Sequence, residues 1–296
     1  MRRGYPRSMK RRLAALLLVT VAASCGGTSA VDDPFAYDAS QPLQIENGAR
    51  LPANERVVVQ GLTYTSGDDR VEAYLVRPRA QSGSMPAVVF LHGAGGDRDE
   101  QLAFATALAE QGAFALTITA PSRRKSPPPD ATPEAALRWQ RNTVVADVVA
   151  ARRGFDLLVA ERADGDRLGL VGWSMGARLA TIVADVDERV RATVFMSGGA
   201  LPIAEYVAAA PDDLRDDVQD VLPAIDPLSH IGSVRGAVFV QAGRSDAVVP
   251  ERALRALAAA APDGTRVRWY AADHALNADA ERERLEWLAD RLELAG

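Results

Sequence analysis

A serine flanked by glycines carries the clearest chemical signal in this sequence. Residues 172–176 spell GWSMG, an apolar stretch at 168–171 precedes them, and a segment with helical spacing at 176–186 follows. Two small residues permit a sharp turn between a strand and a helix, which lifts the serine hydroxyl above the end of a sheet. We therefore predict that Ser174 is a nucleophile. The backbone N–H of Met175, at the start of the helix, is the predicted first donor to an oxyanion.

A serine hydroxyl needs a neighbouring base, and this sequence has three histidines. His274 follows a strand predicted at 265–270, so we expect it at the carboxyl edge of the sheet, where the serine also lies. His92 follows a buried strand upstream, and its ring is expected to hold a loop by hydrogen bonds. His230 is expected to be a structural residue near the start of a loop. The predicted base is therefore His274.

The acid of such a site orients the imidazole and stabilises its protonated form. Asp246 lies in the turn after a strand predicted at 236–241, downstream of the serine and upstream of His274. The competing candidates are Asp226, Asp263 and Asp273. Asp226 precedes a proline and suits a turn or a helix cap. Asp273 adjoins His274 in sequence, which gives its carboxylate a poor approach to Nδ1. We predict Asp246 as the acid.

A glycine-rich loop at 92–96 follows the apolar run 87–91. Glycines allow a backbone to approach a substrate closely. We predict that the N–H of Ala94 is the second oxyanion donor, with the N–H of Gly95 as the alternative. Acyl transfer by serine, histidine and aspartate requires no metal or organic cofactor, and none is expected.

The segments around these residues alternate between strand and helix, which is typical of a mostly parallel sheet with helices on both faces. A β-hairpin is predicted at 55–77, and an acidic helical segment at 201–222 is predicted to be a small cap insertion whose acids form a solvated face. A basic loop at 121–133 is expected to be exposed. The other predicted strands are 87–91, 113–119, 167–171, 191–196, 236–241 and 265–270, and the other helices are 99–111, 134–162, 176–186, 251–260 and 280–294.

These motifs, which span residues 87–280, together resemble the α/β-hydrolase superfamily and its dienelactone-hydrolase-like branch. The resemblance implies an α/β-hydrolase fold with the order serine, acid, histidine. Dienelactone hydrolases carry a cysteine nucleophile where this chain has Ser174, which favours ester hydrolysis of the carboxylesterase kind (EC 3.1.1). The chain also resembles the catalytic domain of prolyl-oligopeptidase-type peptidases, so an amide or peptide hydrolase is the first alternative. A non-catalytic cell-envelope binding protein is the second.

The N-terminus has the features of an export signal. Residues 1–24 contain six basic side chains, no acidic one and an apolar run at 13–23. That run is too short for a standard membrane span, which needs roughly 20 residues. The remainder of the chain is more acidic than the overall net charge of −5 suggests, which argues against nucleic-acid binding.

The one cysteine, Cys25, stands where this signal ends, in a run ASCGG that resembles the lipobox of bacterial lipoproteins. Lipobox sequences usually have leucine three residues before the cysteine, and this chain has Ala22 there. We expect an exported protein, anchored to the cell envelope by lipid on Cys25, or otherwise periplasmic or secreted. Residues 25–54 lack periodicity and are predicted to be a flexible tether, so the predicted domain is 55–296. The expected partners are a small ester substrate and the membrane surface, with no protein partner implied.

Overall fold

The computed structural model describes residues 33–80 and 83–294. The chain divides into two units, residues 1–33 and 34–296, and the described residues belong almost entirely to the second. The predicted signal peptide 1–24 and Cys25 lie outside the described residues. Within the described ranges, no helix is both long and apolar enough to cross a membrane.

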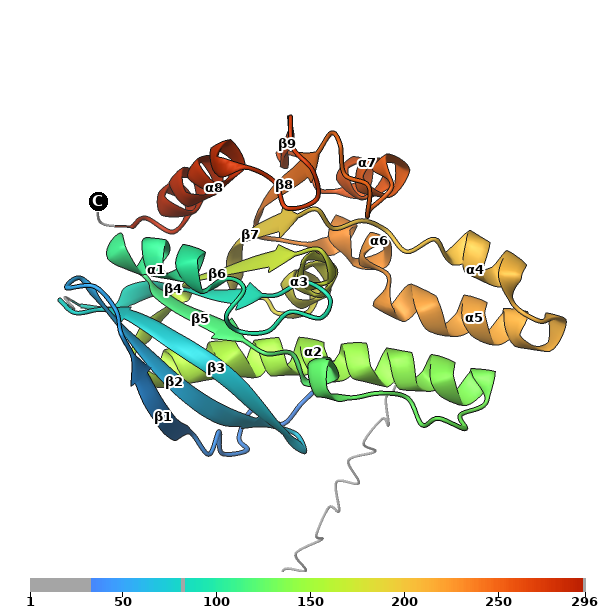
Figure 1. The fold of residues 1–296 in the computed structure, drawn as a ribbon, viewed down its shortest axis with the longest axis horizontal. Helices are drawn as coiled ribbons and strands as arrows, with labels where there is room; N and C mark the ends of the chain where they lie inside the picture. Colours follow the sequence, from blue (N-terminus) through green and yellow to red (C-terminus); the bar gives the residue numbers. More distant parts are fainter. Residues whose placement is uncertain (1–32, 81–82, 295–296) are drawn as a thin grey trace, which may run out of the picture. The chain divides into compact units, whose positions relative to one another are not determined.

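A nine-stranded sheet forms the centre of the described unit (Figure 1). In spatial order its strands are β1 (Glu46–Leu51), β2 (Val57–Ser66), β3 (Asp69–Pro78), β5 (Phe114–Ile118), β4 (Met85–Leu91), β6 (Ala163–Trp173), β7 (Val190–Met196), β8 (Ala237–Gly243) and β9 (Arg266–Tyr270). Strands β1, β2, β3 and β5 pair antiparallel in succession. From β5 to β9 every pairing is parallel, which confirms the predicted mostly parallel sheet.

Helices cover both faces of the parallel part of the sheet. They are α1 (Leu102–Glu110), α2 (Pro133–Ala160), α3 (Met175–Val186), α7 (Glu251–Ala260) and α8 (Ala278–Arg291). In β4, Val89 and Leu91 belong to the core with residues of α2 and α3, whereas Val88 and Phe90 belong to the core with residues of α1 and α8. Successive strand residues point to opposite faces, so a continuous apolar run is what a strand buried on both sides requires.

The predicted cap insertion lies between β7 and β8. It contains α4 (Ile203–Ala209) and α5 (Arg215–Val221), followed by short turns that lead to α6 (Pro227–His230). Its apolar side packs Leu214, Val218 and Ile225 against Leu137 of α2, along the first half of that helix (Figure 1). The acidic side chains of α5 are exposed, in line with the predicted solvated face.

The prediction of a flexible tether at 25–54 is wrong for the part that the structure describes. Strand β1 pairs with β2, with Glu46 opposite Thr63 and Leu51 opposite Val59. Phe35 is only 3% exposed and belongs to the core on the α2 side of the sheet. The compact unit therefore begins near Pro34 rather than at residue 55.

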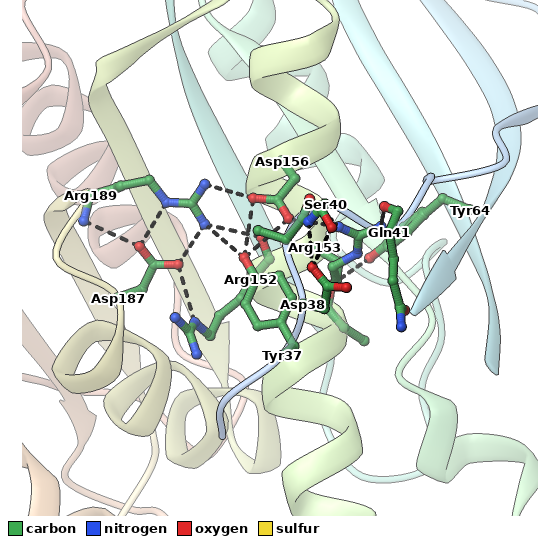
Figure 2. A network of polar contacts seen from close by, with 12 residues as sticks. Tyr37, Asp38, Ser40, Gln41, Tyr64, Arg152, Arg153, Asp156, Asp187 and Arg189 are labelled. Atoms are coloured by element: carbon green, nitrogen blue, oxygen red, sulfur yellow. Dashed lines mark hydrogen bonds and ion pairs between the residues drawn. The ribbon is translucent and has the colours of Figure 1, made fainter. Parts of the chain in front are cut away.

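A network of charged side chains holds the segment 35–41 against α2 (Figure 2). The Tyr37 hydroxyl donates to Asp156 at 3.1 Å. Arg152 donates to the carbonyl of Phe35 at 2.7 Å, and Arg153 donates to the carbonyl of Gln41 at 2.6 Å. These long-range contacts fix a segment that has no periodic apolar pattern of its own, which is why sequence patterning does not indicate that it is folded.

Candidate active site

Ser174 occupies the sharp turn between β6 and α3. Its backbone has φ 54° and ψ −113°, in a region that non-glycine residues rarely adopt. The Ser174 N–H donates to the carbonyl of Met196 in β7 at 2.8 Å, which ties the turn to the neighbouring strand. Such strain persists only where the surroundings enforce it, and it is common at functional sites.

The two flanking glycines allow this turn to pack. A Cβ atom on Gly172 would collide with the carbonyl of Gly176, across the turn itself. A Cβ atom on Gly176 would collide with the carbonyls of Leu91 and His92 at the end of β4. The turn therefore needs glycine at both positions to bring the start of α3 against the loop after β4.

His274 and Asp246 complete a chain of hydrogen bonds with Ser174. The Ser174 hydroxyl lies 2.9 Å from Nε2 of His274, and Nδ1 of His274 lies 2.8 Å from Oδ2 of Asp246. With the proton on Nδ1, the imidazole donates to the carboxylate and accepts from the serine hydroxyl. The structure thus brings together three residues that lie 28 and 100 positions apart in sequence.

The carboxylate of Asp246 is buried and well supplied with donors. Its side chain is 2% exposed, and Oδ1 accepts the N–H groups of Val248 and Val249, both at 2.9 Å. Burial alone would raise the pKa of Asp246. The hydrogen bond from His274 and the two backbone donors outweigh burial and hold the pKa below its ordinary value. Asp246 is therefore ionised at neutral pH, as an imidazole-orienting acid must be.

The acid loop and the base loop are joined through their backbones. Ser245 donates to the carbonyl of Ala272 at 3.0 Å, and Arg244 donates to the carbonyl of Tyr270 at 2.9 Å. On the other side, Trp173 Nε1 donates to the carbonyl of His274 at 2.9 Å. The imidazole position is consequently set by the strand before the nucleophile as well as by the acid.

The two predicted oxyanion donors lie on either side of the nucleophile turn. Met175 is the first residue of α3, and Ala94 is exposed in the loop after β4. Within the described residues, neither N–H has a hydrogen-bond acceptor. Glu100 fixes the loop by accepting the N–H of Gly93 at 2.6 Å. Both groups are thus open to a ligand oxygen.

The other histidines lie outside this hydrogen-bond chain. His92 is buried, with Nδ1 at 2.7 Å from the carbonyl of Gly93 and Nε2 accepting the N–H of Ala120 at 2.9 Å. His230 contacts the carboxylate of Asp185 at 2.7 Å and the carbonyl of Ala224 at 3.1 Å. Both arrangements stabilise local structure, as predicted.

The competing carboxylates are also engaged elsewhere. Asp226 accepts the N–H of Leu201 at 2.9 Å and that of Leu228 at 3.1 Å. Asp273 accepts the N–H of Ala275 at 3.0 Å. Neither is hydrogen-bonded to His274. In residues 33–80 and 83–294, no group of three or more histidine, cysteine or acidic side chains is arranged to hold a metal ion.

A cavity of about 220 Å³ beside the nucleophile turn was not predicted from the sequence. It lies between α2, α3 and the cap, and its walls include Trp139 of α2, Met175 of α3 and Ile225 of the cap. Two charged side chains, Asp147 and Arg178, also line it. A local signal for Arg178 exists, because it lies one helical turn beyond the serine on the helix that the GWSMG run begins.

Asp147 accepts the N–H of Ser122 at 2.8 Å and is 2% exposed. Burial raises its pKa to about 6, against the smaller lowering effects of its hydrogen bonds with Ser122 and of the positive charge of Lys125. Lys125 itself pairs with Asp69 at 2.7 Å, and Arg124 pairs with Glu72 at the same edge. The basic loop is therefore largely neutralised by the hairpin strands.

The fold and this constellation of side chains define an α/β-hydrolase. The model of the dienelactone hydrolase family matches residues 71–291. The chain belongs to that family, and it is a hydrolase. The resemblance inferred from the motifs is thereby confirmed.

Solved structures show the same fold at low sequence identity. An acetyl xylan esterase from Paenibacillus sp. R4 has a TM-score of 0.71 and 18% identity, covering 85% of this chain and 90% of that one. A putative dienelactone hydrolase from Klebsiella pneumoniae subsp. pneumoniae MGH 78578 has a TM-score of 0.62 and 15% identity, covering 80% and 98%. A prolyl endopeptidase has a TM-score of 0.63 and 19% identity, covering 82% of this chain and 40% of its own. No curated protein matches the sequence significantly.

Proposed function

We propose that this protein is a serine hydrolase that cleaves carboxylic esters through an acyl-enzyme on Ser174. The observation that carries the proposal is the continuous hydrogen-bond chain from Asp246 through His274 to the Ser174 hydroxyl. Geometry of this kind provides a nucleophile, a base and an orienting acid in contact.

The proposed reaction has two steps. In the first, the Ser174 oxygen attacks the ester carbonyl while His274 Nε2 takes the hydroxyl proton and then gives it to the departing alkoxide. In the second, His274 takes a proton from water, whose oxygen attacks the acyl-enzyme, and returns the proton to Ser174 as the acid leaves. The N–H groups of Met175 and Ala94 would stabilise the oxyanion in both steps.

A fluorophosphonate probe tests the nucleophile directly. We expect the probe to label the folded protein once per chain, on Ser174, and to leave Ser174→Ala unlabelled. Folded protein that resists labelling would refute the proposal.

Amide or peptide hydrolysis is the alternative, because a prolyl endopeptidase has the same fold. Rates on p-nitrophenyl esters and aminoacyl p-nitroanilides decide between the two, and we expect esters to be the better substrates. Equal activity of wild-type protein and Ser174→Ala on every ester would instead favour a non-catalytic binding protein.

We further propose that the mature protein is held at a membrane surface by lipid on Cys25. The support is the position of this cysteine at the end of an apolar, basic-flanked leader. Cys25→Ser is expected to move the protein from the membrane fraction to the soluble fraction. Unchanged fractionation would contradict the anchor and leave periplasmic or secreted protein as the alternative.

A further inference from the structure

Arg178 presents a positive charge to the cavity beside the nucleophile turn. It lies on α3, one helical turn or about 5.4 Å beyond Ser174, and it lines the cavity together with Met175. Met175 directly follows the nucleophile, so the cavity adjoins the position of the reacting carbonyl. Because residues four apart are neighbours on a helix surface, an acyl chain attached to Ser174 would extend toward the Arg178 side chain.

Arg178 forms no ion pair within the described residues. Across the described ranges, no carboxylate lies within ion-pair distance of it, and its one hydrogen bond runs from Nε to the carbonyl of Gly199 at 3.1 Å. The nearby acid Asp226 already accepts the N–H groups of Leu201 and Leu228. Burial lowers the pKa of the guanidinium, which reflects the cost of desolvating an unpaired charge.

The terminal nitrogens of Arg178 keep some exposure to solvent. No acceptor contacts these two nitrogens within residues 33–80 and 83–294. Neither of them is among the buried side-chain atoms that lack a hydrogen-bond partner. A guanidinium presents paired donors that match a carboxylate. An anionic group entering the cavity would therefore find both charge and donors in place.

Apolar residues of the cavity lining would orient such a ligand. Trp139, Leu179 and Ile225 give the cavity an apolar lining suited to methylene groups. Asp147 lines the same cavity and accepts the N–H of Ser122. With a pKa of about 6 it is mainly ionised at neutral pH and repels an anion from its end of the cavity. An anion is thus attracted to the Arg178 end of the cavity.

We propose that Arg178 determines specificity by binding a carboxylate at the far end of the substrate's acyl group, so that hemiesters of short dicarboxylic acids are preferred over neutral esters. This inference rests on the proposed ester hydrolysis at Ser174. In this account Arg178 touches the substrate but takes no part in proton transfer.

The test compares two esters of equal acyl length, mono-p-nitrophenyl glutarate and p-nitrophenyl pentanoate, after subtraction of the uncatalysed rates. The readout is the ratio of their kcat/KM values in wild type, Arg178→Met, Arg178→Lys and Arg282→Met. Arg282 is a matched control, since it lies exposed on α8 and pairs with Asp279. We expect wild type to favour the glutarate ester, and Arg178→Met to lower the ratio by roughly tenfold or more through KM. Arg178→Lys should retain part of the preference, and Arg282→Met should keep all of it.

Two results would overturn the role of Arg178. One is a wild-type enzyme without preference for the glutarate ester. The other is an Arg178→Met variant that loses activity equally on both esters, as expected if Arg178 only supports the loop at Gly199.

A binding measurement separates this inference from the proposed function. Glutarate should bind Ser174→Ala in a calorimetric titration, and the double variant with Arg178→Met should lose that binding. If neutral esters are hydrolysed but glutarate does not bind, the inference fails and the proposed function stands. If the probe does not label Ser174 and neither ester is hydrolysed, the proposed function itself fails.

Discussion

Partly buried arginines occur in two regions of this protein that differ in how the guanidinium is paired. In the network at the start of the compact unit, Arg189 contacts both Asp156 and Asp187 at 2.7 Å (Figure 2). In the cavity beside the nucleophile, Arg178 has one backbone carbonyl and no carboxylate among the described residues. Because a buried charge is costly unless it is paired, the first arrangement stabilises the fold. The second arrangement leaves the Arg178 guanidinium without an ion-pair partner among the described residues, so it can bind an anionic ligand.

The carboxylates of the two regions also differ, because their pKa values are shifted in opposite directions. Burial would raise the pKa of Asp187, but the hydrogen bonds and charge of Arg189 hold it below the ordinary value. For Asp147 in the cavity, burial dominates and the pKa rises to about 6. The network carboxylate is thus stabilised in its charged form, whereas the cavity carboxylate is not. Variants of each region should accordingly affect different properties.

The largest effect is expected from Asp246→Asn, which changes catalysis. An amide in this position favours the wrong imidazole tautomer, and the corresponding change in a known triad lowers kcat by about 10⁴-fold. Ester hydrolysis measured on folded protein should fall by a similar order. A variant that retains most of its activity would show that Asp246 does not orient His274.

Asp187→Asn should change stability and leave catalysis intact. Removing a hydrogen bond to a charged group typically costs about 1.5–3 kcal/mol. The side chain of Asp187 is 3% exposed, whereas that of its partner Arg189 is 34% exposed. Urea unfolding at neutral pH should show this loss, while kcat/KM at a temperature where the variant is folded should match wild type. Because the folded pKa is lowered, this stabilisation is present above the ordinary pKa and lost as the pH falls through the folded value. An unchanged free energy of unfolding at neutral pH would show that Asp187 does not stabilise the fold.

Asp147→Asn should have a smaller effect of opposite sign. The folded protein binds a proton more tightly than the unfolded chain between pH 4 and about 6, so stability falls as the pH rises through this window. A shift of about two pKa units corresponds to at most about 3 kcal/mol. The variant, which lacks the titrating group, should be more stable than wild type at pH 8, and this difference should disappear near pH 4. Parallel stability curves for the two proteins would contradict the raised pKa.

Much of this architecture follows from local patterns in the sequence. The apolar run at 87–91 becomes β4 with both faces covered, and the predicted helix at 251–260 corresponds to α7. The placement of Ser174, Asp246 and His274 at one edge of the sheet follows from parallel strands, because each residue lies within four positions of the carboxyl end of its strand. The parallel direction of the strands thus predicts that Ser174 and His274, 100 positions apart, lie at the same edge.

The folded segment 33–54 and the cavity were not predicted from the sequence for the same physical reason. The segment 33–54 is folded because Phe35 enters a core made by distant residues and Tyr37 meets Asp156, which lies 119 positions away. The cavity likewise forms only where α2, α3 and the cap meet, so the helix pattern places Arg178 one turn beyond Ser174 but does not indicate the cavity that it lines. Contacts of this kind depend on tertiary packing and leave little periodic signal.

The proposed ester hydrolysis requires Ser174 and His274 to act as one unit. The decisive measurement is kcat/KM for a p-nitrophenyl ester with wild-type protein, Ser174→Ala and His274→Ala, each verified as folded. We predict that the two variants lose activity to a similar extent, because removing either member disables the same acyl transfer. Wild-type activity in His274→Ala would show that His274 is not the base for Ser174 and would leave His92 or His230 as the candidates.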